Sequence, residues 1–266
     1  MYDAANDRWQ LMGAARGLAP TGAHKNLTIA CYAAASMTIH AEEVVLRNAA
    51  GTPYLATQFN LVVDITVTGA GGLAVGAEAA STWYYVWLIY NPSSNTVSAV
   101  LSVSYTATTL PAGYTYSALI GAVYNDASAN LRLSHQSGRE VWMVPFNIFV
   151  GKAAAAGSTW EQLAGADLTA QHAAFPEFLV KKIRGLVATT SSTNGLSVAL
   201  STGAPSQIGM VSMVAPSAAA LMTFGGYGSM PWEMVWPYTA QGNTGLWWMA
   251  SDTAAKNTLQ ITGFTI

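Results

Sequence analysis

Short runs of apolar residues that alternate with polar ones recur along most of this chain. Residues 27–31 and 36–41 alternate in this way, and residues 61–67 are rich in β-branched side chains. A period of two residues is typical of a strand with one buried face, whereas an amphipathic helix repeats every 3.6 residues. From residue 26 onward, the pattern therefore predicts β-strands.

The run from Trp83 to Tyr90 differs because apolar residues occupy both alternating sets of positions. Such a run predicts a central strand that is covered on both faces, by its own chain or by a neighbouring one. It is followed by Asn91–Asn95, where Pro92 fixes one backbone angle and the Asn and Ser side chains can hydrogen-bond the turn. A returning strand is expected at residues 97–102.

Similar strand and turn signals fill the rest of the chain. Further strands are expected at residues 43–47, 117–124, 178–190, 196–201, 209–214 and 259–266, with turns at 48–51, 69–72, 111–114 and 125–130. Closely spaced strands with such turns predict an all-β fold of antiparallel β-sandwich domains. The last predicted strand ties the end of the chain into a sheet. The only helical signals are weak, at residues 9–15 and 159–168.

Changes in composition divide the chain into three predicted parts. Residues 1–20 form an N-terminal arm, which ends at Gly17 and Pro20, and the alternatives for it are a docking segment or a frayed terminus. A small-residue stretch at 151–157 separates a β-sandwich at 21–150 from a β-rich part at 151–266. The docking candidates in the arm are Trp9, Leu11 and Met12.

Charged residues make up only 9% of the chain, and apolar residues 52%. Soluble domains average roughly 25% charged residues, so a lone monomer of this composition would have few charges for its surface. A membrane protein, a secreted wall-like protein and an obligate oligomer are the three classes that fit. The longest dense apolar run, residues 83–90, is too short for a spanning helix.

The remaining bulk properties narrow these classes. The N-terminus lacks the basic start and apolar core of a secretory signal, so synthesis in a cytoplasm is expected. Cys31 is the only cysteine and is expected to be a small buried hydrophobic residue. A formal net charge of −2 gives no indication of nucleic-acid binding. No membrane insertion is predicted.

No motif predicts catalysis, a cofactor or a metal site. Glu42 and Glu43 are adjacent, and adjacent residues of a strand point to opposite faces, so they are a poor acid/base pair. The histidines have no metal-ligand spacing; they are His24, His40, His135 and His172. There is no Gly-x-Ser-x-Gly motif and no phosphate-binding loop. The chain is therefore not expected to be an enzyme.

Several short motifs occur in one order between residues 16 and 145. They are Ser81-Thr82-Trp83-Tyr84, Ile89-Tyr90-Asn91-Pro92, Leu110-Pro111-Ala112-Gly113-Tyr114 and Ile120-Gly121-Ala122-Val123, with Ala41–Leu46 and Phe59–Leu61 upstream. In these motifs the chain resembles a module that recurs in tail-fibre and other appendage proteins of tailed bacteriophages. The second half resembles that family only loosely, in Ile261-Thr262-Gly263-Phe264.

The resemblance implies a β-sandwich, a homotrimer and no catalytic residues. It agrees with the composition, because a trimer that buries much of each chain needs few charges. Two roles in a virion assembled in the host cytoplasm stay open. One is a tail fibre, spike or receptor-binding component; the other is a head fibre or capsid decoration protein. In either role the N-terminal arm would dock the chain to other virion proteins. A glycan-degrading enzyme is a third alternative, which the scarcity of acidic residues disfavours.

The stretch from residue 224 to 248 is rich in aromatic residues set among glycines and prolines, which predict loops. Flat rings on loops can bind a receptor such as a host-surface glycan, with Glu233, Gln241 and Asn243 hydrogen-bonding its hydroxyls. The alternative is that the rings form the core of a second sandwich or a trimer seam. The receptor-binding candidates are Tyr227, Trp232, Trp236, Tyr238, Trp247 and Trp248.

Overall fold

The fold was analysed in a computed structural model of the chain. The structure describes residues 2–3, 8–9, 20–153, 161–163, 166–176, 179–190, 197–201, 211–214, 228–236, 247–250 and 256–266. Within them the chain is all-β, with a large antiparallel sheet and a single helix, α1 (Ala166–Ala174). The fold class predicted from the alternating pattern is confirmed at this level.

Two compact units make up the chain, and neither is continuous in sequence. The first contains residues 1–29, 35–78 and 85–121, and the second contains residues 30–34, 79–84 and 122–266. The predicted division into residues 1–20, 21–150 and 151–266 stays a prediction. Strand β11 (Glu140–Ala153) runs without a break across the predicted boundary at residue 150.

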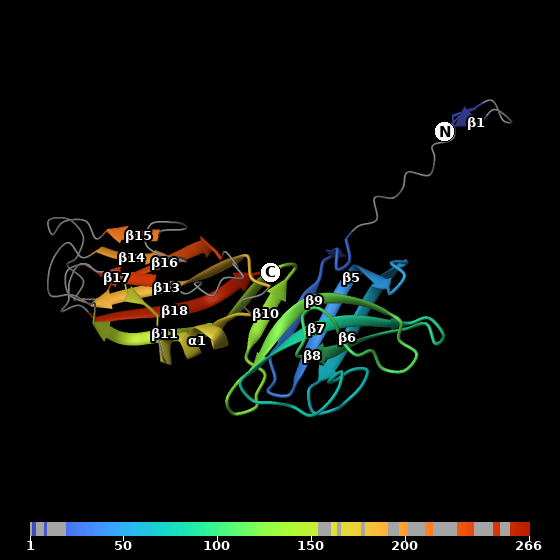
Figure 1. The fold of residues 1–266 in the computed structure, drawn as a ribbon, viewed down its shortest axis with the longest axis horizontal. Helices are drawn as coiled ribbons and strands as arrows, with labels where there is room; N and C mark the ends of the chain where they lie inside the picture. The colour runs from blue at the N-terminus through green and yellow to red at the C-terminus, as the bar shows by residue number, and fades with distance from the viewer. Residues whose placement is uncertain are drawn as a thin grey trace. The chain divides into compact units, whose positions relative to one another are not determined.

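The first unit is organised around strand β5 (Ser36–Asn48). β5 pairs antiparallel with β3 (His24–Lys25), with β6 (Pro53–Asp64) and, at one end, with β9 (Tyr116–Asn125). β4 (Thr28–Cys31) precedes β5 in the chain. In Figure 1 the blue β5 lies beside β6.

The sequence predicted two strands where the structure has the single strand β5. The buried side is odd-numbered up to Ala41 and even-numbered from Val44, although the register with β6 stays continuous. Opposite this switch lies Gln58, whose φ of 47° is unusual for a residue with a side chain. β5 and β6 both switch the side that carries their buried residues at this point. They therefore stay paired in one continuous ladder, although the alternation in the sequence is broken.

Strand β7 (Thr82–Asn91) is buried on both alternating sets of positions, as the sequence predicted. It pairs with β8 (Thr96–Ser102) through the predicted turn. Asn91 Oδ1 accepts hydrogen bonds from the backbone N–H groups of Ser93 and Ser94, at 2.9 and 3.3 Å. Gly113, with a φ of 84°, lies so close to Asn91 that a side chain there would meet its amide. The turn chemistry expected from Asn91 is therefore confirmed.

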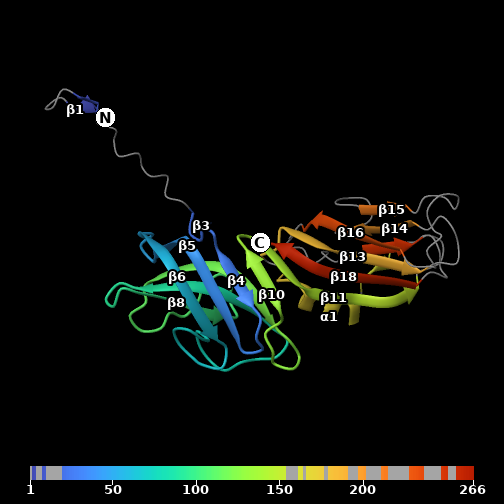
Figure 2. The same ribbon diagram turned by 180° about the vertical axis from the view of Figure 1, so that it is seen from behind.

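The second unit contains the strands that follow. They are β10 (Ser134–Ser137), β11, β12 (Glu161–Gln162), β13 (Lys182–Thr190), β14 (Ser197–Ser201), β15 (Val211–Val214), β16 (Gly228–Val235), β17 (Trp247–Ala250) and β18 (Lys256–Thr265). One set pairs in the order β16-β13-β18-β11-β10, and another in the order β12-β17-β14-β15. In Figure 2 the red β18 lies between β13 and β11, so the predicted final strand is central in this set.

One face of this sheet carries the core of the second unit, and α1 packs on β11. The buried residues include Phe175 next to α1, Ile183 on β13 and Phe264 on β18. Cys31 is 1% exposed, as expected for a small buried hydrophobic residue. Burial raises the pKa of its thiol to about 12.

Three local predictions were wrong. Trp9 belongs to a short strand, β2 (Arg8–Trp9), which pairs with β1 (Tyr2–Asp3), so the helical spacing there misled. The helix predicted at 159–168 begins only at Ala166. Residues 228–235, expected to be loop, form β16; Pro231 is tolerated because β16 ends the strand order of its sheet, where a missing N–H is least costly.

A candidate binding surface on the second unit

The solvent side of β10 and β11 places a histidine next to a tryptophan. The two strands are joined by a two-residue loop whose first residue, Gly138, has a φ of 60°. A glycine at this position allows the turn that matches the twist of a hairpin. The resulting register sets His135 directly opposite Trp142, with ring centroids 6.5 Å apart. Trp142 is 45% exposed, so the hairpin presents it to solvent.

Tyr32 extends this aromatic surface on the other side of His135. Its hydroxyl lies 3.0 Å from His135 Nδ1, and the two ring planes differ by only 9°. The ring centroids are 6.2 Å apart. A bond this short between a phenol oxygen and a ring nitrogen at that centroid distance requires the rings to lie side by side rather than face to face. Since Tyr32 is 70% exposed, its ring presents a flat face to solvent.

Arg184 continues the row beyond Trp142. Gly263 on β18 is the register partner of both Trp142 on β11 and Arg184 on β13. A side chain at Gly263 would come within 2.7 Å of Arg184 Nε. The missing side chain leaves room for the guanidinium, whose Cζ lies 4.8 Å from the centre of the Trp142 ring. This is the geometry of a cation–π contact.

Arg184 is held in place by a dense set of acceptors. Nη1 donates to Glu140 Oε2 at 2.5 Å, and Nη2 donates to the backbone oxygens of Val141 and Phe264. Thr265 Oγ1 donates to the other oxygen of Glu140 at 2.8 Å. Partial burial alone would raise the pKa of Glu140, but the hydrogen bonds from Thr265 and Arg184, with the charge of Arg184, hold it below its usual range. Glu140 therefore stays ionised at neutral pH.

An open cavity of about 560 Å³ adjoins the end of the row on β13 and β16. Its lining includes Arg184, Leu186, Pro231, Trp232 and Glu233. Glu233, the register partner of Arg184, accepts a hydrogen bond from Lys182 Nζ at 2.9 Å. Trp232 is 5% exposed, and its Nε1 finds no acceptor among the described residues.

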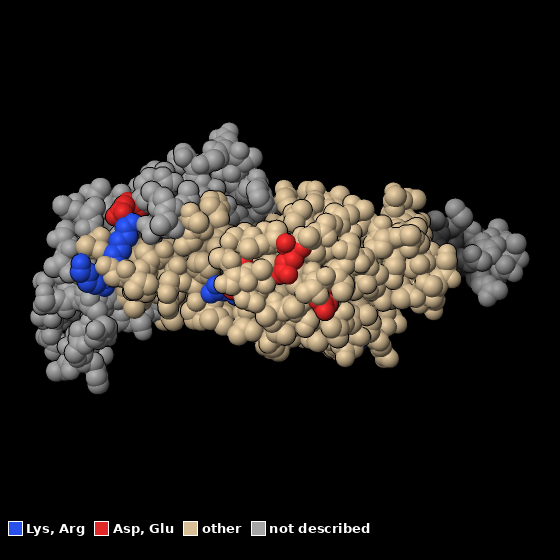
Figure 3. Space-filling model, turned by 90° about the horizontal axis from the view of Figure 1, so that it is seen from below, with Lys and Arg blue, Asp and Glu red and all other residues tan. Residues whose placement is uncertain are grey.

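The row and the cavity together form what we call the aromatic strip. It consists of Tyr32, His135, Trp142, Arg184, Glu140 and the cavity-lining residues Glu233 and Trp232. Its two ion pairs, Arg184–Glu140 and Lys182–Glu233, each join one cation to one carboxylate. On the face shown in Figure 3, charged side chains are few and scattered over a mostly uncharged described surface. The strip thus offers rings and paired polar groups with no excess charge of either sign.

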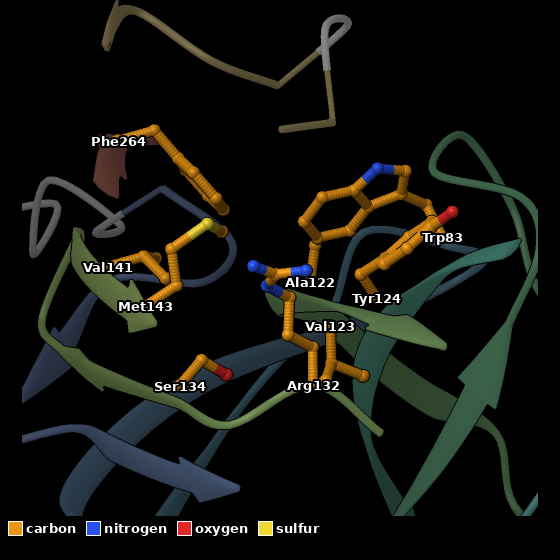
Figure 4. A pocket seen from close by; sticks show the side chains of 9 residues that line it. All are labelled: Trp83, Ala122, Val123, Tyr124, Arg132, Ser134, Val141, Met143 and Phe264. Carbon is orange, nitrogen blue, oxygen red and sulfur yellow. The ribbon is translucent and has the colours of Figure 1, made fainter. Parts of the chain in front are cut away.

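A second cavity lies inside the second unit and is no larger than a water molecule, at about 10 Å³. Figure 4 shows Arg132 extending into it between Met143 and Trp83. Arg132 Nη2 donates to the backbone oxygens of Val144 and Pro145, and its guanidinium lies 4.3 Å from the centre of the Phe146 ring. Burial lowers the pKa of Arg132. The arginine fills this space and leaves no room for a ligand.

Of the predicted receptor-binding residues, Trp232 is among those that line the cavity. Trp232 and Trp236 are 5% and 3% exposed and belong to the core of the second unit, which agrees with the alternative prediction that the aromatic rings form a core. Trp232 is buried because β16 turns its even-numbered side chains to the core, and Trp236 directly follows that strand. Trp247 and Trp248 lie in β17, and Tyr227 and Tyr238 lie outside the described residues.

The predicted docking residues are only partly described. Trp9 lies in β2, and Leu11 and Met12 lie outside the described residues. Within the described ranges, no three histidine, cysteine or acidic side chains gather at one point to bind a metal. His24, His40 and His135 lie on β3, β5 and β10, and His172 lies on α1. No helix in the described part of the chain has the length and apolar character needed to cross a membrane.

Sequence reasoning missed Tyr32, His135, Trp142, Arg184 and Glu140. One signal for the central pair was present, because the Ser-Gly turn at residues 137–138 between two short alternating runs marks a hairpin and sets its register. No local signal links Arg184 to Trp142, because β13 reaches β11 only through β18.

Comparison with known proteins adds little to this description. Neither a protein-family model nor a curated protein matches the chain. Among solved structures, a Bacillus thuringiensis Cry1Da tryptic core variant is similar with a TM-score of 0.24 and 10% sequence identity. The match covers 100% of this chain and 56% of that chain. Similarity at this level supports no conclusion about function.

Proposed function

We propose that this chain is a structural protein of a bacteriophage virion, a tail fibre, spike or receptor-binding component that contacts the host surface. The observation that carries the proposal is the ordered set of appendage-like motifs between residues 16 and 145. No catalytic role is proposed for the chain. We propose that the chain assembles into the virion and exposes a surface that contacts the host.

The places of those motifs in the fold support a structural role for them. Ile89-Tyr90-Asn91-Pro92 covers the end of the buried strand β7 and the start of its turn. Gly113, in a second motif, packs against the Asn91 side chain. Residues with this structural role are the ones that we expect to recur in different proteins that contain the same module.

We further propose a homotrimer of β-sandwich domains. The support is the low charge of the chain together with exposed aliphatic side chains in the first unit, including Val62, Val75 and Val103. Burial of such residues between copies is favourable by about 25 cal/mol for each Å² of apolar surface. Sedimentation equilibrium of the purified chain is expected to give three times the monomer mass of 27.9 kDa. A monomer at micromolar concentration contradicts this arrangement.

The place of the chain in the virion is tested by electron microscopy with gold-labelled antibodies raised against the purified protein. Gold at the tail tip or tail fibres supports the proposed role. Gold on the head supports the alternative, a head fibre or capsid decoration protein docked through residues 1–20. Purified virions that contain none of the chain by mass spectrometry refute both.

Contact with the host is tested separately by adsorption competition. Purified protein is mixed with host cells before the virions are added. Saturable binding that lowers virion adsorption supports a receptor-binding component. A folded oligomer that leaves adsorption unchanged contradicts the host-contact role and favours a scaffolding role in the virion.

A further inference from the structure

We propose that the aromatic strip of the second unit binds an uncharged oligosaccharide, with the sugar rings lying on Tyr32, His135 and Trp142. The inference deepens the proposed function, on which it rests, because it names the ligand class of the host-contact role. It also moves the binding surface from the C-terminal tryptophans, two of which are buried, to the β10–β11 hairpin and its neighbours.

The first argument is the shape that the rings make together. The Tyr32 and His135 ring planes are parallel to within 9°, and the Trp142 plane is tilted by 32° from that of His135. Aromatic rings that bury a face usually do so against each other or in a core. Here Tyr32 and Trp142 remain 70% and 45% exposed, although the Arg184 guanidinium covers one face of Trp142. Their exposed ring surface suits a ligand that is itself flat and has apolar C–H groups on one side. A sugar ring has this property.

The second argument is that the positions of the rings are fixed before any ligand binds. Trp142 is held between its cross-strand partner His135 and the guanidinium of Arg184. Arg184 in turn is held by Glu140 and by the backbone oxygens of Val141 and Phe264. A site with rings already ordered loses little side-chain entropy on binding.

The third argument is the charge of the strip. Each cation is paired with a carboxylate, in Arg184–Glu140 and Lys182–Glu233. A polyanionic ligand would meet Glu140 and Glu233 as well as the cations, so no net attraction steers it to the strip. Hydroxyl groups can donate to the carboxylates and accept from the cations, which makes paired ions suitable partners for a neutral polyhydroxylated chain.

The fourth argument is the cavity at the end of the row. It is about 560 Å³ and lies over the paired strands β13 and β16, and this volume is within the usual size range for a small-molecule site. Arg184 and Glu233 line it with groups that can hydrogen-bond the hydroxyls of a sugar. We place one end of the bound oligosaccharide there.

The experiment measures binding of the purified full-length protein to a defined set of hexasaccharides by isothermal titration calorimetry. The neutral probes are cellohexaose, maltohexaose, chitohexaose and a β-1,4-linked galactose hexamer, and the charged probe is a heparin hexasaccharide. We expect saturable binding of at least one neutral probe and weaker binding of heparin. No neutral binding, or tighter binding of heparin, overturns the proposal.

Variants locate the site. Trp142→Ala is expected to weaken binding of the neutral probe by about tenfold or more, because a central tryptophan is a common binding hot spot. Tyr32→Ala is expected to weaken it less, since it lies at the edge of the row. The matched control is Val150→Ala, an exposed aliphatic side chain on the same strand β11, which is expected to leave affinity unchanged.

Two further measurements separate loss of a sugar contact from loss of the fold or of the oligomer. Circular dichroism and thermal melting of Trp142→Ala are expected to match the parent, since the side chain is exposed. Should Trp142→Ala unfold, Tyr32→Ala and Tyr32→Phe decide, with Phe retaining the flat ring and most of the affinity. If Trp142→Ala changes the oligomer mass in sedimentation without changing sugar affinity, the strip is an interface between copies and the proposal is wrong.

This test uses no virions, so its failure is separate from failure of the proposed function. Sugar binding by a chain that virions lack would refute the virion role and leave the strip as a glycan site. A chain that is present on the tail and competes for adsorption, but binds none of the probes, would keep the virion role and overturn the strip.

Discussion

Each compact unit contains a group of neighbouring aromatic residues, one packed within the fold and the other at the surface. In the first unit, Tyr54, Tyr90 and Tyr116 pack against each other, with the Tyr54 and Tyr90 rings stacked within 6° of parallel. Tyr90 is buried, and its hydroxyl donates to Asn95. In the second unit, Tyr32 and Trp142 are exposed, and each lies next to His135.

The difference shows that residue type alone does not decide between a core and a surface role. Tyr90 belongs to a strand buried on both faces, so its ring has no solvent side to turn to. Trp142 belongs to a strand whose neighbours Val141 and Met143 are buried, so its own position faces out. The face that a position occupies determines whether a ring stabilises the fold or remains free to bind.

The two units also differ in how exposed their ion pairs are to solvent. Lys25–Glu42 in the first unit is exposed, whereas Arg184–Glu140 in the second includes an arginine side chain that is only 19% exposed. Exposed pairs contribute little to stability, while pairs with several hydrogen bonds and partial burial contribute more. Substitutions can therefore separate structural from surface groups in each unit.

The largest effect is expected for Gly185→Ala in the second unit. An added methyl would overlap the backbone oxygen of Gln260 and lie 2.7 Å from the Trp232 ring, so β13 and β18 would have to separate. We expect the free energy of unfolding to fall by about 3 kcal/mol or more, the upper end for overpacking. Urea unfolding followed by circular dichroism measures it.

The control for Gly185 is Gly151→Ala on β11. It has a φ of 64° and nothing within 4 Å of the added methyl. Only left-handed backbone strain of about 1–2 kcal/mol is then expected. Equal losses at the two glycines would mean that Trp232 and β18 do not pack closely on Gly185.

A slightly smaller effect is expected for Leu88→Ala on β7. Leu88 is fully buried, and truncation of such a residue costs about 2–5 kcal/mol. Thr57→Ala on β6 is the control, since Thr57 is exposed and surface substitutions stay within about 0.5 kcal/mol. A small loss at Leu88 would contradict burial of β7 on both faces.

A moderate, pH-dependent effect is expected for Glu140→Gln. Because the folded pKa of Glu140 lies below its usual value of 4.5, the ionised form stabilises the fold at neutral pH. This contribution is lost as the pH falls below about 4.5 and through the folded pKa. The melting temperature of the variant is expected to lie below that of the parent at pH 7 and to approach it toward pH 3. A constant difference over this range would mean that the carboxylate charge is not responsible.

The smallest effect is expected for Glu42→Gln in the first unit. Glu42 accepts from Lys25 and Asn26, and these hydrogen bonds lower its pKa, but both charged groups are solvated. The melting temperature is expected to stay within experimental scatter at physiological salt. A shift as large as that of Glu140→Gln would remove the contrast between the exposed and the partly buried pair.

Local patterns were sufficient for the β7–β8 hairpin of the first unit because its signals are close in sequence. Asn91 specifies a turn because its side chain accepts hydrogen bonds from backbone N–H groups within the next three residues. The apolar run before it has apolar residues on both faces, so it forms a strand that is buried on both faces. The alternation of β5 is interrupted at Glu42, which led to the prediction of two strands. The matching change of face in the partner strand occurs at Gln58 on β6, so the local sequence of β5 does not reveal it.

The second unit was harder to predict for a physical reason. The glycines and Pro231 around Trp232 are typical of loops, yet this segment pairs at the end of a sheet, where proline is acceptable. The strip depends on Gly263, which leaves room for the Arg184 side chain to reach Trp142. Strands β13 and β18 pair across about 78 residues of sequence, so a local sequence pattern cannot reveal this contact.

The single cysteine, Cys31, can report how often this part of the protein opens. Cys31 is buried and its thiol pKa is raised to about 12, so at neutral pH a thiol-specific reagent meets neither an accessible sulfur nor a thiolate. Labelling can proceed only when this part of the chain opens. With reagent in excess, the rate of modification reports how often the protein opens, and it can be followed by mass in the isolated chain and in an assembled particle without adding a tag.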